Sequence, residues 1–151
     1  MKKIISLFAA VLLLTVISAG CSGKFSPEER RVINTAQAFL KARTNLNYKM
    51  ITGTEGIQYT TEQGRKKMKE DASQQVSAYK DYKGSSNLAS TSDFKVTGLK
   101  NNDAEVTGNF KLKTKSETQP NTNSIKSYKF KATLKKVRGT WLVDTWGFMP
   151  Q

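Results

Sequence analysis

The hydrophobic pattern of the chain changes sharply between its first residues and the remainder. After Lys2 and Lys3 comes an apolar run from residue 4 to about residue 17, and small residues follow it. A positive start, a short apolar run and small residues predict a secretory signal peptide over residues 1–20. The run is shorter than the roughly 20 residues that a membrane-spanning helix needs.

The first helical period begins at Ser26. Ser26 can cap a helix, Pro27 suits the first helical position, and Glu29 completes a capping box. Apolar residues then follow at helical spacing, which predicts a helix to about residue 43. This stripe consists of Val32, Ile33, Ala36, Phe39 and Leu40.

A second helical period begins at Thr60 or Thr61, after a mixed segment over residues 48–60 that predicts a loop with one short turn of helix. Its apolar stripe is thin, which is typical of a helix lying on a surface. The stripe consists of Met68, Ala72, Val76 and Tyr79. We expect residues 84–87 to end this helix.

After residue 87 the period becomes alternating. Strands are predicted around residues 94–98, 104–112, 128–134 and 140–148, with hairpin connections at residues 100–103, 116–123 and 138–139. Two helices followed by four hairpin-linked strands predict an α+β domain over residues 26–151, with the helices packed on one face of a curved antiparallel sheet.

The spacing of the two tryptophans leaves two interpretations open. Trp141 and Trp146 are five residues apart, so strict alternation places them on opposite faces of the last strand. One tryptophan is then exposed and could anchor a protein partner. A bulge would instead bring both into the core.

Charge adds a second feature, because the formal charge of the chain is +13 and removal of Lys2 and Lys3 leaves +11. Such a charge favours anionic partners. Alternation places several lysines on the sheet face opposite the aromatic residues, as a possible partner-binding face: Lys111, Lys113, Lys129, Lys131 and Lys135. The other interpretation is the ordinary polar side of a half-buried sheet. Nucleic acid is not an expected partner, since no aromatic residue shares that face.

The sequence argues against an enzyme. It contains no histidine, and its single cysteine is Cys21. Asp144, with Tyr128 or Tyr79 nearby, is the best catalytic set that can be assembled, and pairing of Asp144 with a lysine such as Lys136 is the alternative. We expect no catalytic residues, no cofactor and no metal site.

Cys21 follows Ser18, Ala19 and Gly20, and this segment resembles the bacterial lipobox, although Ser18 stands where that family usually has leucine. The resemblance implies lipidation of Cys21 and a tether over residues 21–25 that anchors the protein to the cell membrane on the extracytoplasmic side. An ordinary free thiol beyond a conventional cleavage site is the other interpretation.

Residues 136–144 contain a Lys-x-x-Gly-x-Trp-x-Val pattern and resemble the closing strand pair of cystatin-like and nuclear transport factor 2-like domains. The resemblance implies a small lipoprotein of the kind found in conjugative mobile elements, with an envelope protein as partner, in conjugation or entry exclusion. Two alternatives stay open: an anionic envelope polymer on the basic face, or an apolar ligand in the cone between helix and sheet. That cone is lined by Phe39, Leu40, Phe110 and Trp141. The oligomeric state is left open.

Overall fold

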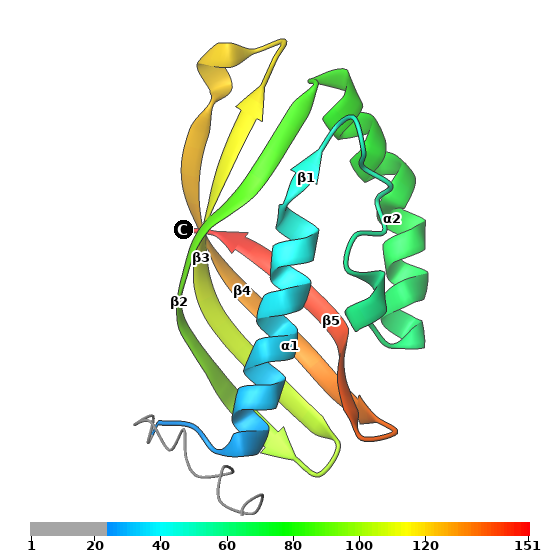
Figure 1. Cartoon of the computed structure of the whole chain (residues 1–151), viewed down its shortest axis with the longest axis vertical. Helices are drawn as coiled ribbons and strands as arrows, with labels where there is room; N and C mark the ends of the chain where they lie inside the picture. The colour runs from blue at the N-terminus through cyan, green and yellow to red at the C-terminus, as the bar shows by residue number, and fades with distance from the viewer. Residues whose placement is uncertain (1–23) are drawn as a thin grey trace, which may run out of the picture.

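The computed structural model describes residues 24–151, so the predicted signal peptide and Cys21 lie outside the described residues. The α-helices are α1 (Pro27–Thr44) and α2 (Glu62–Asp81), and single 3₁₀ turns cover Ile57–Tyr59 and Pro120–Thr122. The strands are β1 (Leu46–Asn47), β2 (Gly84–Lys100), β3 (Asp103–Ser116), β4 (Ser124–Val137) and β5 (Thr140–Pro150) (Figure 1). The predicted α+β class is confirmed.

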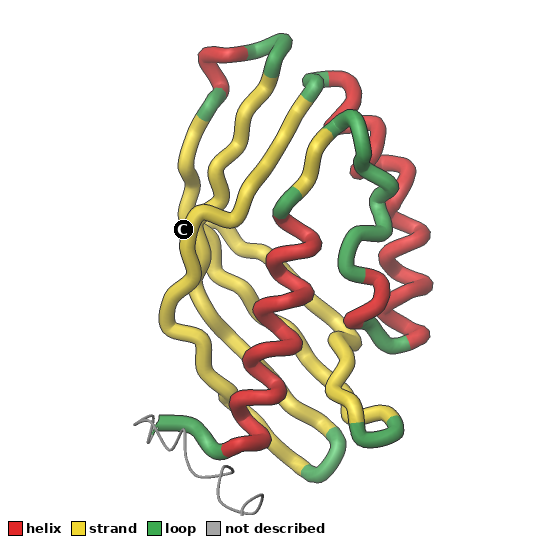
Figure 2. Tube along the Cα trace, viewed as in Figure 1, coloured by secondary structure: helices red, strands yellow, loops and turns green. Residues whose placement is uncertain are grey.

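The strands form one antiparallel sheet in the order β1-β2-β3-β4-β5, and both helices lie on its concave side (Figure 2). The prediction of four strands was wrong by one, because two-residue β1 pairs with Ser85 and Ser86 of β2. The predicted helix end at residues 84–87 was also wrong, since α2 ends at Asp81 and these residues begin β2. Ser86 is 1% exposed there and donates a hydrogen bond to the Thr44 carbonyl oxygen at 2.6 Å.

The start of α1 is built as the sequence predicts. The Glu29 amide donates to Ser26 Oγ at 3.2 Å, and the Ser26 amide donates to Glu29 Oε2 at 2.7 Å, so both halves of the capping box are present. From this cap α1 runs across the concave face of the sheet and contacts all four long strands.

The cone between α1 and the sheet is filled by side chains. The four residues predicted to line it, Phe39, Leu40, Phe110 and Trp141, are at most 3% exposed and belong to one core cluster. The Phe39 ring also lies 4.9 Å from the ring of Trp146. The prediction of an apolar ligand in this cone was therefore wrong, because the core residues occupy the space themselves.

A β-bulge in β5 decides the position of both tryptophans. Thr145 lies opposite Thr133 and Val143 lies opposite Leu134, so Asp144 is the extra residue. The bulge lets Trp141 and Trp146 both face the helices, with Trp141 3% exposed and Trp146 packed against the core. The interpretation with a bulge is confirmed.

Gly108 of β3 lies at a tightly packed point of the core. A Cβ atom at this position would lie 2.3 Å from the ring of Phe94, which itself stacks on Phe130. We predict that Gly108→Ala lowers the free energy of unfolding by about 1–3 kcal/mol, as overpacking of a filled core does. Chemical denaturation followed by tryptophan fluorescence measures this.

The matched control is Gly147→Ala in β5, where a Cβ atom meets nothing within 4 Å. This variant should unfold at the wild-type denaturant concentration or slightly above it, because strand glycine carries an entropic cost. Equal stability of the two variants would contradict the tight contact between Gly108 and Phe94.

Candidate functional site

The five predicted basic-face lysines are all exposed, and β3 and β4 pair with each other as the prediction required. They are staggered along the strands instead of lying directly opposite one another. Lys111 lies opposite Ser127, and Lys129 lies opposite Asn109. Lys111 and Lys129 are therefore diagonal neighbours on the convex side of the sheet, with their Cα atoms about 7–8 Å apart.

Two of the five lysines are neutralised by carboxylates. Lys131 Nζ lies 3.2 Å from Glu105 Oε2, and Lys135 Nζ lies 3.1 Å from Asp144 Oδ2. Hydrogen bonds from Thr97 and then from Lys131 hold the pKa of Glu105 below its ordinary value. These pairs reduce the positive charge at the end of the face where Lys131 and Lys135 lie.

The remaining lysines, Lys111, Lys113 and Lys129, have no carboxylate partner among the residues that the structure describes. We call these three the convex basic face. Ile125 lies directly opposite Lys113 and is 61% exposed, so a large apolar side chain stands beside the cations. A single exposed apolar side chain is ordinary on a protein surface, so the three cations are what distinguishes this face.

Asp144 does not face an open site. Its Oδ1 accepts a hydrogen bond from Thr61 Oγ1 at 2.6 Å, and its other oxygen pairs with Lys135. The alternative pairing with Lys136 was wrong, because Asp144 pairs with Lys135 and Lys136 pairs with Glu28. Thr61 also caps α2 by accepting from the Gly64 amide, so this contact fixes the start of α2 on β5.

The proposed catalytic partners of Asp144 are not assembled around it. Tyr128 lies opposite Pro150, six residues beyond Asp144 on β5, which places it about 20 Å away. The Tyr79 hydroxyl is 2.8 Å from Ser86 Oγ, and burial raises the pKa of this tyrosine. Within residues 24–151 no group of three or more histidine, cysteine or acidic residues is placed to hold a metal ion.

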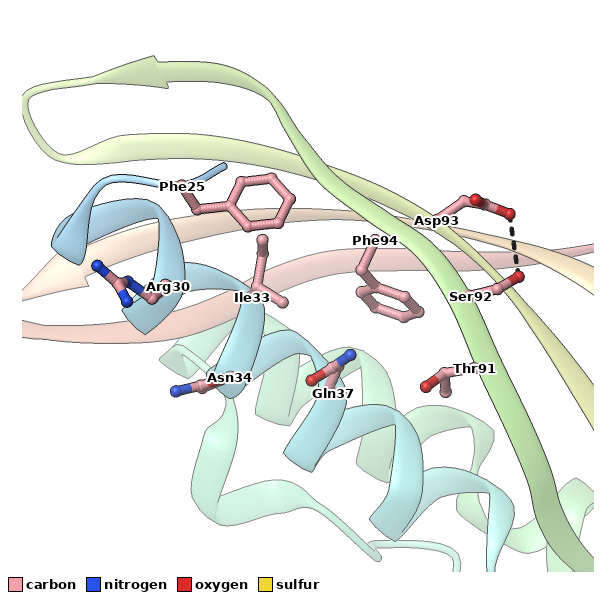
Figure 3. A pocket seen from close by; sticks show the side chains of 9 residues that line it. All are labelled: Phe25, Arg30, Ile33, Asn34, Gln37, Thr91, Ser92, Asp93 and Phe94. Atoms are coloured by element: carbon pink, nitrogen blue, oxygen red, sulfur yellow. Dashed lines mark hydrogen bonds between the residues drawn. The ribbon is translucent and has the colours of Figure 1, made fainter. Parts of the chain in front are cut away.

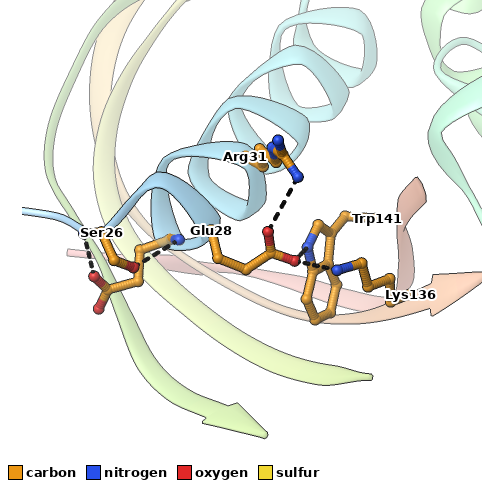
Figure 4. Close-up of polar contacts among 6 residues, drawn as sticks. Ser26, Glu28, Arg31, Lys136 and Trp141 are labelled. Atoms are coloured by element: carbon orange, nitrogen blue, oxygen red, sulfur yellow. Dashed lines mark hydrogen bonds and ion pairs between the residues drawn. The ribbon is translucent and has the colours of Figure 1, made fainter. Parts of the chain in front are cut away.

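A polar cluster centred on Glu28 joins the start of α1 to the β4–β5 hairpin (Figure 4). Glu28 Oε1 accepts from Lys136 Nζ at 2.6 Å and from Trp141 Nε1 at 2.7 Å. Its second oxygen lies 3.4 Å from Arg31. The sequence analysis missed this cluster, because its partners are 108 and 113 residues away from Glu28.

A pocket of about 300 Å³ opens between α1 and β2 (Figure 3). Phe25, Ile33 and Phe94 form its apolar part, and Asp93 lies at its rim. The Asp93 carboxylate accepts from Ser92 and from Asn109, each at 3.0 Å, so it is engaged within the protein. The pocket therefore combines an apolar floor with polar groups at its rim that are hydrogen-bonded within the protein.

Solved structures share the fold of this chain. An IcmL-like type IV secretion system protein from Legionella pneumophila superposes with a TM-score of 0.64 at 14% identity, over 84% of this chain and 96% of that chain. A periplasmic fragment of TraM gives 0.51 at 14% identity, over 78% and 97%. The intermembrane space region of the chloroplast protein ARC6 gives 0.51 at 8% identity, over 81% and 94%.

At these identities the likeness shows a common fold. No protein-family model and no curated protein sequence matches the chain. Among the described residues, neither helix is long and apolar enough to span a membrane.

The Glu28 cluster predicts a specific pH dependence. Hydrogen bonds from Lys136 and then from Trp141 hold the pKa of Glu28 below its ordinary value of 4.5. A depressed carboxyl pKa contributes stability that is present above that ordinary value and is lost as the pH falls through the folded-state pKa. We predict that acidification lowers the melting temperature of the wild type more than that of Glu28→Gln.

Thermal melts followed by circular dichroism over a pH series measure the difference. The control is Glu70→Gln, which removes an exposed carboxylate from the middle of α2 that takes part in none of the ion pairs among the described residues, and it should leave the wild-type pH dependence. If the melting temperature of Glu28→Gln fell with acidification as much as that of the wild type, the cluster would not favour the ionised carboxyl of Glu28.

Proposed function

We propose that this protein is a lipoprotein, anchored through Cys21 on the extracytoplasmic side of the cell membrane, whose cystatin-like domain is a non-catalytic protein-interaction module. Its role lies in conjugation, in secretion through a related apparatus, or in entry exclusion. The single observation that supports this most is the shared fold with an IcmL-like type IV secretion system protein, since that protein is matched over 96% of its length.

A second line of support is the cell compartment in which such a domain would act. The TraM fragment of the same fold is periplasmic, and the segment before Cys21 favours export of this chain as well. The filled core and the engaged Asp144 leave surface recognition as the activity that the described residues favour.

The convex basic face supplies the surface for this role. Among the described residues, no carboxylate pairs with Lys111, Lys113 or Lys129, and Ile125 adds an apolar contact beside Lys113. Charges of one sign around an apolar centre favour the acidic surface of an envelope protein through electrostatic complementarity. An anionic envelope polymer is the second candidate, since the same three lysines would attract it.

The anchor is tested first. We predict that Cys21→Ser abolishes incorporation of labelled palmitate and moves the protein out of the membrane fraction, because two acyl chains supply the binding. Metabolic labelling and cell fractionation measure both effects. The control is Ser18→Leu, which supplies the usual lipobox residue and should keep the label. Membrane retention of an unlabelled Cys21→Ser variant would contradict the anchor.

The partner is tested by photo-cross-linking in the native cells. With a photoreactive residue in place of Ile125, we expect one membrane protein of a transfer apparatus to be recovered by mass spectrometry. Replacing Lys111, Lys113 and Lys129 by serine should reduce this recovery about tenfold, since exposed ion pairs contribute roughly 0.5 kcal/mol each.

The matched control replaces Lys66, Lys67 and Lys69 by serine, which removes the same charge from exposed positions of α2. This variant should cross-link like the wild type. Recovery of wall polymer or lipid alone would favour polymer binding instead of protein binding. An equal loss of cross-linking in both triple variants would show that only the net charge of the protein matters, and not the position of the three lysines.

A further inference from the structure

One end of the domain brings together the start of α1 and the two hairpin turns that lead from β2 to β3 and from β4 to β5 (Figure 1). We call this the tether end. The Lys136 amide donates to the Asn102 carbonyl oxygen at 2.7 Å, which joins the two turns. Glu28 joins them to α1 through Lys136 and Trp141. The three segments therefore form one rigid surface.

The tether end carries both cations and exposed apolar side chains. Leu99 beside the first turn is 40% exposed, and Val137 in the second is 43% exposed. Basic side chains outnumber the acidic ones, which are Glu28, Glu29 and Asp103. The basic side chains are Lys24, Arg30, Arg31, Lys100, Lys136 and Arg138.

The position of Cys21 selects this end over the opposite one, which is also basic. Ser26 comes five positions after Cys21, so an extended tether reaches at most about 17 Å. The opposite end of the domain lies where β3 turns into β4. It is farther from Ser26 by about the length of β3, which is about 45 Å for 14 residues. A lipid on Cys21 therefore keeps the tether end near the bilayer.

We propose that the tether end rests on an anionic membrane surface, with Lys100 and Arg138 at the lipid phosphates and Leu99 and Val137 in the headgroup layer. This inference rests on the lipid anchor of the proposed function. Basic residues near an anionic leaflet contribute favourable energy, and short apolar side chains bury themselves at its boundary. In this orientation the long strands rise from the membrane, and the convex basic face stays free for a protein.

The orientation is tested with the full lipidated protein in vesicles of phosphatidylglycerol and phosphatidylcholine. Because lipid blocks the Cys21 thiol, a new cysteine is the only site for a fluorophore. Val137→Cys reports on the tether end, and Ile125→Cys reports on the far end of the convex side. We expect lipids with a spin-labelled headgroup to quench the fluorophore at position 137 and to leave that at position 125 bright.

Charge is tested by combining Lys100→Gln with Arg138→Asn in the Val137→Cys protein. Asparagine tolerates the positive φ of 51° at position 138. We expect the ratio of contacting to non-contacting molecules to fall about 30-fold, the equivalent of about 1 kcal/mol for each cation. Added salt should reduce quenching in the protein that keeps both cations, which tests the same point without these substitutions.

Co-sedimentation with the vesicles separates the possible failures. A protein that does not co-sediment overturns the anchor and this orientation together. A protein that co-sediments with both fluorophores bright overturns the orientation alone. Stronger quenching at position 125 than at position 137 would show that the domain lies on its convex face. If the fluorophore at position 137 were quenched as much on vesicles of phosphatidylcholine alone, the role of anionic lipid would be overturned.

Discussion

The structure depends on one helix filling the concave side of a sheet with much longer strands. α1 buries Val32, Ala36, Phe39 and Leu40 completely and contacts all four long strands, which a flat sheet would not allow. The sheet curves around the helix because β2 changes register at three places and β5 at one. Bulges bend a strand and increase its twist, so these irregularities are what lets one helix close the core.

The sequence predicted the elements whose signals are local. Ser26, Pro27 and Glu29 define the start of α1 through contacts within one turn, and alternation located the β3–β4 and β4–β5 hairpins. The start of β2 was missed because Gly84 to Asn87 carry no hydrophobic alternation. Ser86 is buried there through hydrogen bonds with Thr44 and Tyr79, and such burial leaves no trace in a pattern of apolar residues.

The convex basic face also combines a local feature that the sequence predicted with tertiary contacts that it did not predict. Alternation alone placed the lysines of β3 and β4 on the side away from the core. Which of them keep an unpaired charge depends on register and on the bulge, because Glu105 and Asp144 neutralise Lys131 and Lys135 from neighbouring strands. The Glu28 cluster was beyond sequence reasoning altogether, since its partners meet only when α1 and the last hairpin have packed.

The proposed anchor and the proposed recognition would place opposite demands on a basic domain beside an anionic membrane. If the convex basic face met the bilayer, Lys111, Lys113 and Lys129 would bind lipid and no protein could reach them. The Glu28 cluster bears on this conflict, because it holds the two hairpin turns against the start of α1, where the tether begins. A second basic surface at the tether end can then meet the lipid, and the strands carry the convex face away from it. In the proposed orientation, two separate sets of basic residues would meet two different partners, and the geometry between α1 and the hairpins would keep these sets apart.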